Sequence, residues 1–347
     1  MKTADFDFNL PADLIALRPA QQRDCSRLLV LHKGGEIEHR TFCDIVDYLD
    51  EGDLLILNDT KVLPARLIAS KPSGGKVDLI IVKVGDNGAC EILCRGGYEG
   101  PVYLGDGTAA IIYFEASHSG AEKKRYLKFG RPEAGGVGEI LERCGLMPLP
   151  PYIKRRPDDN DRERYQTVYA EKGGSIAAPT AGLHFTERVL RALTEKGVHI
   201  RKLTLHVGQG TFKPITANLV RDHEMQSEYF EMPLSLLDDI GNTKKSGRKV
   251  ITVGTTSTRA LEGFLSGIYH KSGNGDGTVR GLTDIFIHPG YRFGAVDALL
   301  TNLHLPRSTP LMLSSAICGR ETLLRAYEEA ISMGYRFFSY GDAMLIL

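Results

Sequence analysis

The chain is organised around the segment Gly173-Gly174-Ser175-Ile176-Ala177-Ala178-Pro179-Thr180-Ala181-Gly182-Leu183-His184-Phe185-Thr186, which contains no Asp, Glu, Lys or Arg. A strongly polar stretch precedes this segment, and an amphipathic helix follows it. Thr186 is a natural N-cap for that helix, because its hydroxyl can accept a hydrogen bond from a backbone N–H of the first turn. The helix ends at Gly197, and its apolar face comprises Val189, Leu190 and Leu193.

This arrangement places His184 and Phe185 at the N-terminal end of a helix. Free N–H groups and the helix dipole favour an anion or a carboxylate at such an end. An uncharged loop beside a helix start is also poorly suited to lie in solvent. Two interpretations remain open at this point: the segment receives a ligand, or it is a buried turn of the core.

The length and the composition set limits on the class of protein. A chain of 347 residues is longer than one compact core usually holds, so we expect two domains or one domain with a large insertion. Hydrophobic residues make up 42% and charged residues 25%, as in ordinary globular proteins. The 43 basic and 43 acidic residues cancel, so any basic face for a nucleic acid must be local.

We expect a cytoplasmic protein with no bound metal. The N-terminus lacks the basic and then apolar pattern of a signal peptide, and no apolar run is long enough for a membrane span. Reduced, mostly buried thiols are typical of a cytoplasmic protein. The cysteines are scattered and do not complete a zinc set with each other or with a histidine cluster: Cys25, Cys43, Cys90, Cys94, Cys144 and Cys318.

The sequence predicts an α/β domain interrupted by an inserted all-β domain. Residues 53–57 form a continuous apolar run, the pattern of a strand that is buried on both faces. From residue 62 to residue 150, short strand-like runs alternate with Gly, Asn and Asp turns, which is typical of a small barrel or sandwich. We therefore assign residues 1–61 and 151–347 to an α/β catalytic domain and residues 62–150 to an inserted β-barrel domain.

Polar loops follow several predicted strands of the α/β domain, namely residues 53–57, 199–207, 249–253, 283–287 and 336–339. Ligand contacts in α/β sheets gather just beyond such strand ends. The loop after residue 253 places four hydroxyls in succession at a helix start but lacks the Walker lysine, which argues against a P-loop ATPase. Taken singly, each loop also reads as a turn with surface residues. Taken together, they predict a composite polar pocket at one sheet edge.

Seven blocks of the sequence resemble those of the S-adenosylmethionine:tRNA ribosyltransferase-isomerase family of queuosine biosynthesis. They occur in order over essentially the full length: Asn58–Val62, Ala178–Thr186, His206–Phe212, Val253–Glu262, Asp284–Tyr291, Thr301–Thr309 and Ser339–Ile346. Leu303 and Pro310 stand where the resemblance leads us to expect Phe and Leu. These departures concern local packing and leave the polar residues intact.

The resemblance implies a fold and a reaction. Such proteins have an α/β domain interrupted by a β-barrel, in agreement with the pattern above. They transfer the ribosyl group of S-adenosylmethionine to 7-aminomethyl-7-deazaguanine at the tRNA wobble position. The product is epoxyqueuosine-tRNA, and adenine and methionine are released. S-adenosylmethionine is then a co-substrate with no further cofactor, tRNA is the partner, and we expect a monomer without membrane association.

Candidate residues follow from that implied reaction. We expect His184 and His206 to act as acid and base, because imidazole titrates near neutral pH, and Asp342 and Asp59 to hold a ribose hydroxyl or an amine. The expected substrate-binding residues are Thr180, Gly182, Phe185, Gly208, Gly210, Thr211, Phe212, Thr255, Thr256, Ser257, Thr258, His288, Asn302, His304 and Tyr340. The expected contacts to tRNA phosphates are Arg66, Arg155, Arg156 and Arg259.

Two other classes of function remain as alternatives. The first is a ribosyl transferase or hydrolase that acts on free nucleosides and has no RNA partner. The second is a non-catalytic RNA-binding module, with the β insertion as its binding face. For each histidine, a hydrogen-bonded place in the core remains an alternative to a catalytic role.

Overall fold

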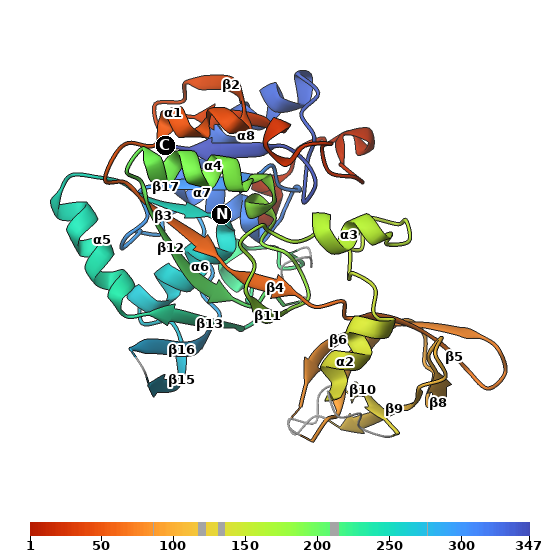
Figure 1. The fold of residues 1–347 in the computed structure, drawn as a ribbon. Coiled ribbons are helices and arrows are strands. Elements are labelled where there is room, and N and C mark those ends of the chain that lie inside the picture. The colour runs from red at the N-terminus through yellow and green to blue at the C-terminus, as the bar shows by residue number, and fades with distance from the viewer. Residues whose placement is uncertain (86, 117–122, 131–135, 209–214, 276) are drawn as a thin grey trace. The chain divides into compact units, whose positions relative to one another are not determined.

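The computed structural model describes residues 1–85, 87–116, 123–130, 136–208, 215–275 and 277–347. The chain divides into two compact units. The α/β unit comprises Met1–Lys61, Gln166–Lys172 and Ala178–Leu347, and the barrel unit comprises Val62–Tyr165 and Gly173–Ala177. An α/β unit interrupted by a β-barrel is the predicted fold class, which is therefore confirmed (Figure 1).

The described residues of the α/β unit form one ten-stranded sheet. In spatial order its strands are β15 (His270–Gly275), β16 (Thr278–Thr283), β13 (Glu228–Pro233), β12 (His199–Leu205), β3 (Leu54–Asn58), β14 (Val250–Val253), β17 (Ala298–Asn302), β18 (Ala343–Ile346), β1 (Arg27–Leu31) and β2 (Ile37–Thr41).

Strand direction brings several polar loops to one edge of this sheet. β12, β3, β14 and β17 run parallel to one another. β18 is antiparallel to β17 and parallel to β1. The carboxyl ends of the four parallel strands therefore lie at the same edge as the segments that precede β18 and β1. We call this edge the carboxyl edge.

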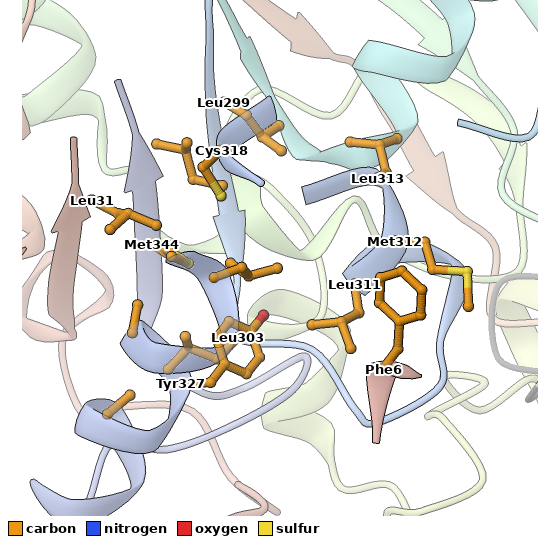
Figure 2. Close-up of a cluster of buried hydrophobic side chains, with 14 of the residues drawn as sticks. Phe6, Leu31, Leu299, Leu303, Leu311, Met312, Leu313, Cys318, Tyr327 and Met344 are labelled. Carbon is orange, nitrogen blue, oxygen red and sulfur yellow. The ribbon is translucent and has the colours of Figure 1, made fainter. Parts of the chain in front are cut away.

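The middle of the sheet is buried on both faces. In β1, Leu28 and Val30 belong to one hydrophobic cluster, whereas Leu29 and Leu31 belong to the other. The first cluster includes α1 (Ile45–Tyr48) and α4 (Glu187–Glu195), and the second includes α7 (Thr309–Cys318) and α8 (Arg320–Ser332). Figure 2 shows the second cluster, where helix side chains meet strand side chains. The remaining α-helices described in this unit are α5 (Ser235–Lys245) and α6 (Gly254–Leu265).

Short 3-10 helices connect these elements: η1 (Thr3–Phe6), η2 (Ala12–Leu14), η3 (Arg23–Cys25), η4 (Phe42–Asp44), η5 (Thr180–His184) and η7 (Val220–Asp222). The predicted N-cap of α4 is confirmed, because Thr186 Oγ1 accepts a hydrogen bond from the Val189 N–H at 3.3 Å. Within the described residues, no helix combines the length and the apolar character needed to cross a bilayer.

The barrel unit contains a closed antiparallel barrel with the strand order β10-β7-β6-β5-β8-β9. Its strands are β5 (Arg66–Ser70), β6 (Lys76–Val84), β7 (Cys90–Cys94), β8 (Gly100–Tyr103), β9 (Ala109–Ala116) and β10 (Lys123–Phe129). Apolar side chains such as Leu67, Leu79 and Leu127 fill its core. The unit also contains α2 (Gly136–Cys144) and α3 (Asp159–Arg164), and β4 (Thr60–Val62) pairs with β11 (Lys172–Ser175) in a two-stranded sheet.

The barrel unit begins at Val62 but extends past residue 150, the predicted end of the inserted domain. Hydrogen bonds within the unit account for the difference. Arg162 donates to carbonyl oxygens at the end of α2 at 2.9 Å. The Leu63 N–H donates to the Ser175 carbonyl at 3.0 Å, which holds Gly173–Ala177 in the same unit.

Two predicted strands of the α/β unit are wrong. The strand predicted over residues 336–339 is absent, and β18 begins at Ala343 instead. Phe338 has a φ of 76°, a left-handed conformation that ends any strand there. The strand predicted over residues 283–287 stops at Thr283, because the next backbone groups bond to side chains: the Ile285 carbonyl accepts from Arg259 Nε at 3.2 Å.

Candidate functional site

A pocket lies at the carboxyl edge, with about 550 Å³ of empty space that is partly open to solvent. We call it the Asn302 pocket. Its walls come from residues 178–181 before and within η5, residues 254–256 at the start of α6, and Asn302 and His304 at the end of β17. Phe338 and Ser339, which precede β18, complete it. The composite pocket expected from the polar loops is therefore present.

A second, shallower pocket adjoins the first, because Thr255, Thr256 and Pro310 line both; its empty space of about 320 Å³ includes open solvent. We call it the Arg259 pocket. Its other walls include Phe286 and Leu313. The first turn of α6 faces both pockets, and no side chain caps that turn. Free N–H groups and the positive end of the helix dipole therefore point toward the shared wall.

A directed chain of hydrogen bonds runs into the Asn302 pocket. The Ser26 hydroxyl donates to the Arg23 carbonyl at 3.3 Å, so its oxygen is free to accept from His184 Nδ1 at 2.7 Å. His184 Nε2 then accepts from Asn302 Nδ2 at 3.1 Å. Asn302 Oδ1 accepts from the Thr180 hydroxyl at 2.8 Å. This assignment leaves the Thr180 oxygen as an acceptor at the pocket wall.

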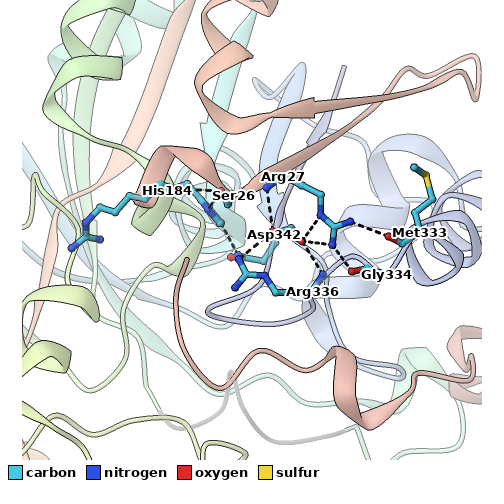
Figure 3. Close-up of polar contacts among 9 residues, drawn as sticks. Ser26, Arg27, His184, Met333, Gly334, Arg336 and Asp342 are labelled. Atoms are coloured by element: carbon cyan, nitrogen blue, oxygen red, sulfur yellow. Dashed lines mark hydrogen bonds and ion pairs between the residues drawn. The ribbon is translucent and has the colours of Figure 1, made fainter. Parts of the chain in front are cut away.

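His184 is neutral at ordinary pH. Burial lowers its pKa to about 4, the nearby Asp342 opposes this shift, and Arg336 and Arg23 reinforce it. Figure 3 shows His184 beside Ser26 in this network. Both ring nitrogens bond to protein groups, and general acid–base work at neutral pH is most efficient with a pKa near 7. The geometry therefore favours a positioning group over the acid or base expected from the sequence.

His206 has a different environment. Its ring is half-buried, stacks on Tyr229 with centroids 5.6 Å apart, and bonds through Nδ1 to Thr60 Oγ1 at 2.8 Å. Burial lowers its pKa, and Glu231 partly offsets the shift. Within the described part of the chain, its Nε2 makes no hydrogen bond. The next residue, Val207, lines the Asn302 pocket.

The two predicted catalytic carboxylates are held by the protein. Asp342 accepts bonds from the backbone N–H groups of Arg27 at 3.1 Å and Arg336 at 2.8 Å, and forms ion pairs with both side chains (Figure 3). Asp59 is buried and accepts from Thr204 Oγ1 at 2.6 Å, and its burial raises its pKa. Neither carboxylate lines either pocket. The geometry favours structural roles for both.

Several expected substrate-binding side chains serve the fold instead. The Ser257 and Thr258 hydroxyls donate to the carbonyls of residues 253 and 254, one turn back along α6. Phe185 packs in the core against Phe42.

Other expected binding residues lie away from the two pockets. Tyr340 is buried and His288 bonds to the Pro289 carbonyl, and neither lines a pocket described above. Gly182 is packed against Tyr169, and the Gly208 N–H donates to Glu228. Gly210, Thr211 and Phe212 lie outside the described residues.

The four predicted tRNA-binding arginines are not equivalent. Arg259 is a correction, because it is buried and its Nη1 bonds to the Glu228 carboxylate, which removes it from the surface. Arg155 forms a two-bond ion pair with the buried Asp161 at 2.6 and 2.7 Å. Arg66 on β5 pairs in the same way with Asp78 on β6. Arg156 is exposed.

One residue important for the site was not predicted as a site residue. Asn58, at the end of β3, donates to the Leu205 carbonyl at 3.0 Å and to Thr256 Oγ1 at 3.1 Å. Its Oδ1 accepts from the backbone N–H groups of Thr60 and Leu205. It thereby ties β3, β12 and the start of α6 together. The sequence feature that could have identified Asn58 is its position as the first polar residue after the apolar run Leu54–Leu57.

Within the described ranges of the chain, no group of three or more His, Cys, Asp and Glu side chains is placed to hold a metal ion. The fold and the pockets define a class: α/β proteins that bind a small ligand at the carboxyl edge of the sheet. A family model described as queuosine biosynthesis protein matches residues 3–346. The chain belongs to this family.

Named relatives cover the whole chain. A protein of Thermodesulfovibrio yellowstonii, named S-adenosylmethionine:tRNA ribosyltransferase-isomerase, is 51% identical over 352 residues and covers 100% of both chains. A protein of the same name from Halothermothrix orenii is 49% identical over 353 residues, again covering 100% of both. The crystal structure of S-adenosylmethionine tRNA ribosyltransferase from Thermotoga maritima is 33% identical, with a TM-score of 0.55, and covers 99% of this chain and 100% of that one.

Proposed function

We propose that this chain is an S-adenosylmethionine:tRNA ribosyltransferase-isomerase. It transfers and isomerises the ribosyl group of S-adenosylmethionine onto 7-aminomethyl-7-deazaguanine at the tRNA wobble position. One observation carries the proposal: residues of five of the blocks that resemble the family line the Asn302 pocket together. These are residues 178–181, Val207, residues 254–256, the group Thr301, Asn302 and His304, and Ser339.

The proposed reaction begins with loss of a proton from the ribose 5′-carbon, which the adjacent sulfonium makes acidic. Adenine then leaves from the anomeric carbon with a proton. The deazaguanine amine attacks the resulting unsaturated sugar, and closure of the epoxide expels methionine. The protein must supply a base, a proton donor and a positioned pocket that excludes water.

We assign the base to His206, whose Nε2 is free within the described part of the chain. Thr180 is proposed to accept a hydrogen bond from a ribose hydroxyl, since its own proton is committed to Asn302. Asn302 and His184 then act through Thr180 as positioning residues. We place Arg156 and its exposed neighbour Lys154 against tRNA phosphates. The monomeric state and the cytoplasmic location stay predictions.

The decisive experiment is a turnover assay. The purified protein is incubated with S-adenosylmethionine and tRNA carrying 7-aminomethyl-7-deazaguanine, in EDTA, and adenine and methionine are followed by chromatography. The proposal requires both products in equal amounts, dependent on the modified tRNA. Unmodified tRNA serves as the control.

The same assay separates the alternatives. Adenine release that is independent of tRNA would support a hydrolase of free nucleosides. Binding of RNA without binding of S-adenosylmethionine would support a non-catalytic module. Loss of activity in EDTA that an added divalent ion restores would contradict the expectation that the reaction needs no metal.

A further inference from the structure

Arg259 carries a buried nitrogen that has no hydrogen-bond partner among the residues that the structure describes. Its side chain is only 8% exposed. Its Nε donates to the Ile285 carbonyl at 3.2 Å, and its Nη1 bonds to the Glu228 carboxylate. Its Nη2 is buried and has no hydrogen-bond partner among the described residues. Because an unpaired buried donor is costly, such a group calls for an acceptor, and the described part of the chain does not supply one.

Glu228 helps to hold the guanidinium of Arg259 in place. Its second carboxylate oxygen accepts from the Gly208 N–H at 2.9 Å, so the carboxylate is held from both sides. The guanidinium is planar, and two of its three nitrogens are now committed. The remaining Nη2 belongs to a side chain that lines the Arg259 pocket.

The surroundings of the Arg259 pocket favour a small anion with an apolar chain. Thr255 and Thr256 belong to the uncapped first turn of α6, and Thr309 and Pro310 belong to the first turn of α7. Two helix dipoles therefore present their positive ends to this space. The rest of the wall is apolar, with Ile285, Phe286 and Leu313 among its residues. Arg259 and Glu228 compensate each other, so the helix ends supply the net attraction.

We propose that the Arg259 pocket binds the carboxylate of the methionyl group of S-adenosylmethionine, an inference that rests on the function proposed above. The carboxylate accepts from Arg259 Nη2, and the methylene groups of the methionyl chain lie along the apolar wall. The two pockets share Thr255, Thr256 and Pro310, so one elongated ligand spans both. Its adenosyl end then occupies the larger Asn302 pocket. A tRNA phosphate does not suit a nine-tenths buried guanidinium between apolar side chains.

The test compares two ligands on the full-length protein: S-adenosylmethionine and its decarboxylated analogue, which differs only by the missing carboxylate. Calorimetry gives both dissociation constants. A charge-assisted hydrogen bond predicts that the analogue binds about 10- to 100-fold more weakly. The Arg259→Lys variant is expected to reduce this ratio to within about threefold. A lysine has one terminal nitrogen, so it cannot bond to Glu228 and also replace Nη2 in the same geometry. Arg191→Gln, at an exposed arginine of α4, is the matched control and should keep the wild-type ratio.

Loss of folding in the Arg259 variant does not remove the test, because the ligand ratio on the unaltered protein decides it alone. Equal affinity for the two ligands overturns the proposal. So does an Arg259→Lys enzyme with an unchanged ratio and a raised KM for modified tRNA, which would place the arginine against the RNA base. The discrimination between S-adenosylmethionine and its decarboxylated analogue is also measured as the ratio of their KM values for adenine release. Turnover with equal KM values for the two ligands contradicts this inference alone. Different affinities for the two ligands without tRNA-dependent turnover contradict the proposed reaction alone.

Discussion

Two histidines of the α/β unit differ in what their ring nitrogens touch. His184 bonds through both nitrogens, to Ser26 and to Asn302. His206 bonds through Nδ1 to Thr60 and keeps Nε2 free within the described residues. A group that exchanges protons with a substrate needs a free nitrogen, so these contacts separate a positioning histidine from a candidate base.

Substitution of each histidine by glutamine tests this difference. His206→Gln should lower kcat by about 100- to 10,000-fold, the usual contribution of a general base. His184→Gln should mainly raise the KM for S-adenosylmethionine, because Asn302 and Thr180 lose their fixed orientation. Single-turnover adenine release measures both effects. Wild-type turnover in a folded His206→Gln protein, checked by circular dichroism, would remove this residue from the mechanism.

The buried histidines also make stability depend on pH. Burial lowers the pKa of His304 to about 3 and that of His184 to about 4. Between these values and the unfolded pKa of about 6.5, the unfolded chain binds protons that the folded chain does not. Stability is therefore fully present above pH 6.5 and is lost as the pH falls through this window.

Denaturant unfolding at pH 7 and pH 4.5 checks this prediction. For His304 the expected loss is on the order of 2 kcal/mol in the free energy of unfolding. His304→Gln keeps a donor for Thr301 and cannot titrate, so its loss over the same interval should be smaller by that amount. An equal loss in the two proteins would show that His304 does not contribute.

At the scale of elements, the position of η5 depends on close packing of Gly182 against Tyr169 and Thr167. A methyl group added at Gly182 would lie 2.0 Å from the Tyr169 hydroxyl and 2.8 Å from Thr167 Cγ2. Gly182→Ala should therefore destabilise the fold by about 2 kcal/mol through overpacking. Gly241 in α5 has nothing within 4 Å, so Gly241→Ala should instead stabilise by roughly 0.5–1 kcal/mol.

The second substitution that tests this contact is Tyr169→Phe, which removes the nearest atom. The Tyr169 hydroxyl is buried without a hydrogen-bond partner among the described residues, so its loss alone should cost little. In the Gly182→Ala background it should restore part of the stability. Thermal unfolding of the four combinations gives the coupling. Additive effects would mean that the two groups do not collide.

The sequence predicted those elements whose pattern is local. The run from Leu54 to Leu57 could be recognised as a buried strand because every side chain in it is apolar. The strand predicted over residues 336–339 failed because the left-handed backbone of Phe338 leaves no trace in hydrophobic pattern. Even so, Asp342 reaches the carboxyl edge, since β18 runs antiparallel to β17 and begins where that strand ends.

The difference between local and long-range signals also explains which residues of the site could be predicted. Thr180, Asn302 and Thr256 were predicted because each follows or begins an element with a clear signal, and they line the Asn302 pocket. The partner of His184 could not be predicted, because Ser26 lies 158 residues away in the chain. Only the pairing of β1 with β18 brings that segment to the carboxyl edge.

At the scale of the whole molecule, zero net charge means that binding of tRNA must rest on local cations. Arg156→Gln should weaken tRNA binding and reduce the slope of log K against log salt by about 1. Arg155→Gln should lower stability instead, since it leaves the carboxylate of buried Asp161 without its main partner. Filter binding at several salt concentrations and thermal unfolding separate the two. An unchanged slope for Arg156→Gln would remove it from the interface.

The place of β18 has a consequence for how the protein is made. The hairpin of β1 and β2 joins the sheet only through β18, whose residues 343–346 come near the end of the sequence. The ribosome therefore releases the apolar strand Leu28–Leu31 and its partner β2 long before its other partner, β18, exists. At about 5–20 residues per second the delay is on the order of tens of seconds. During that interval the edge of β1 that pairs with β18 has no partner strand, so it is open to pairing with other chains.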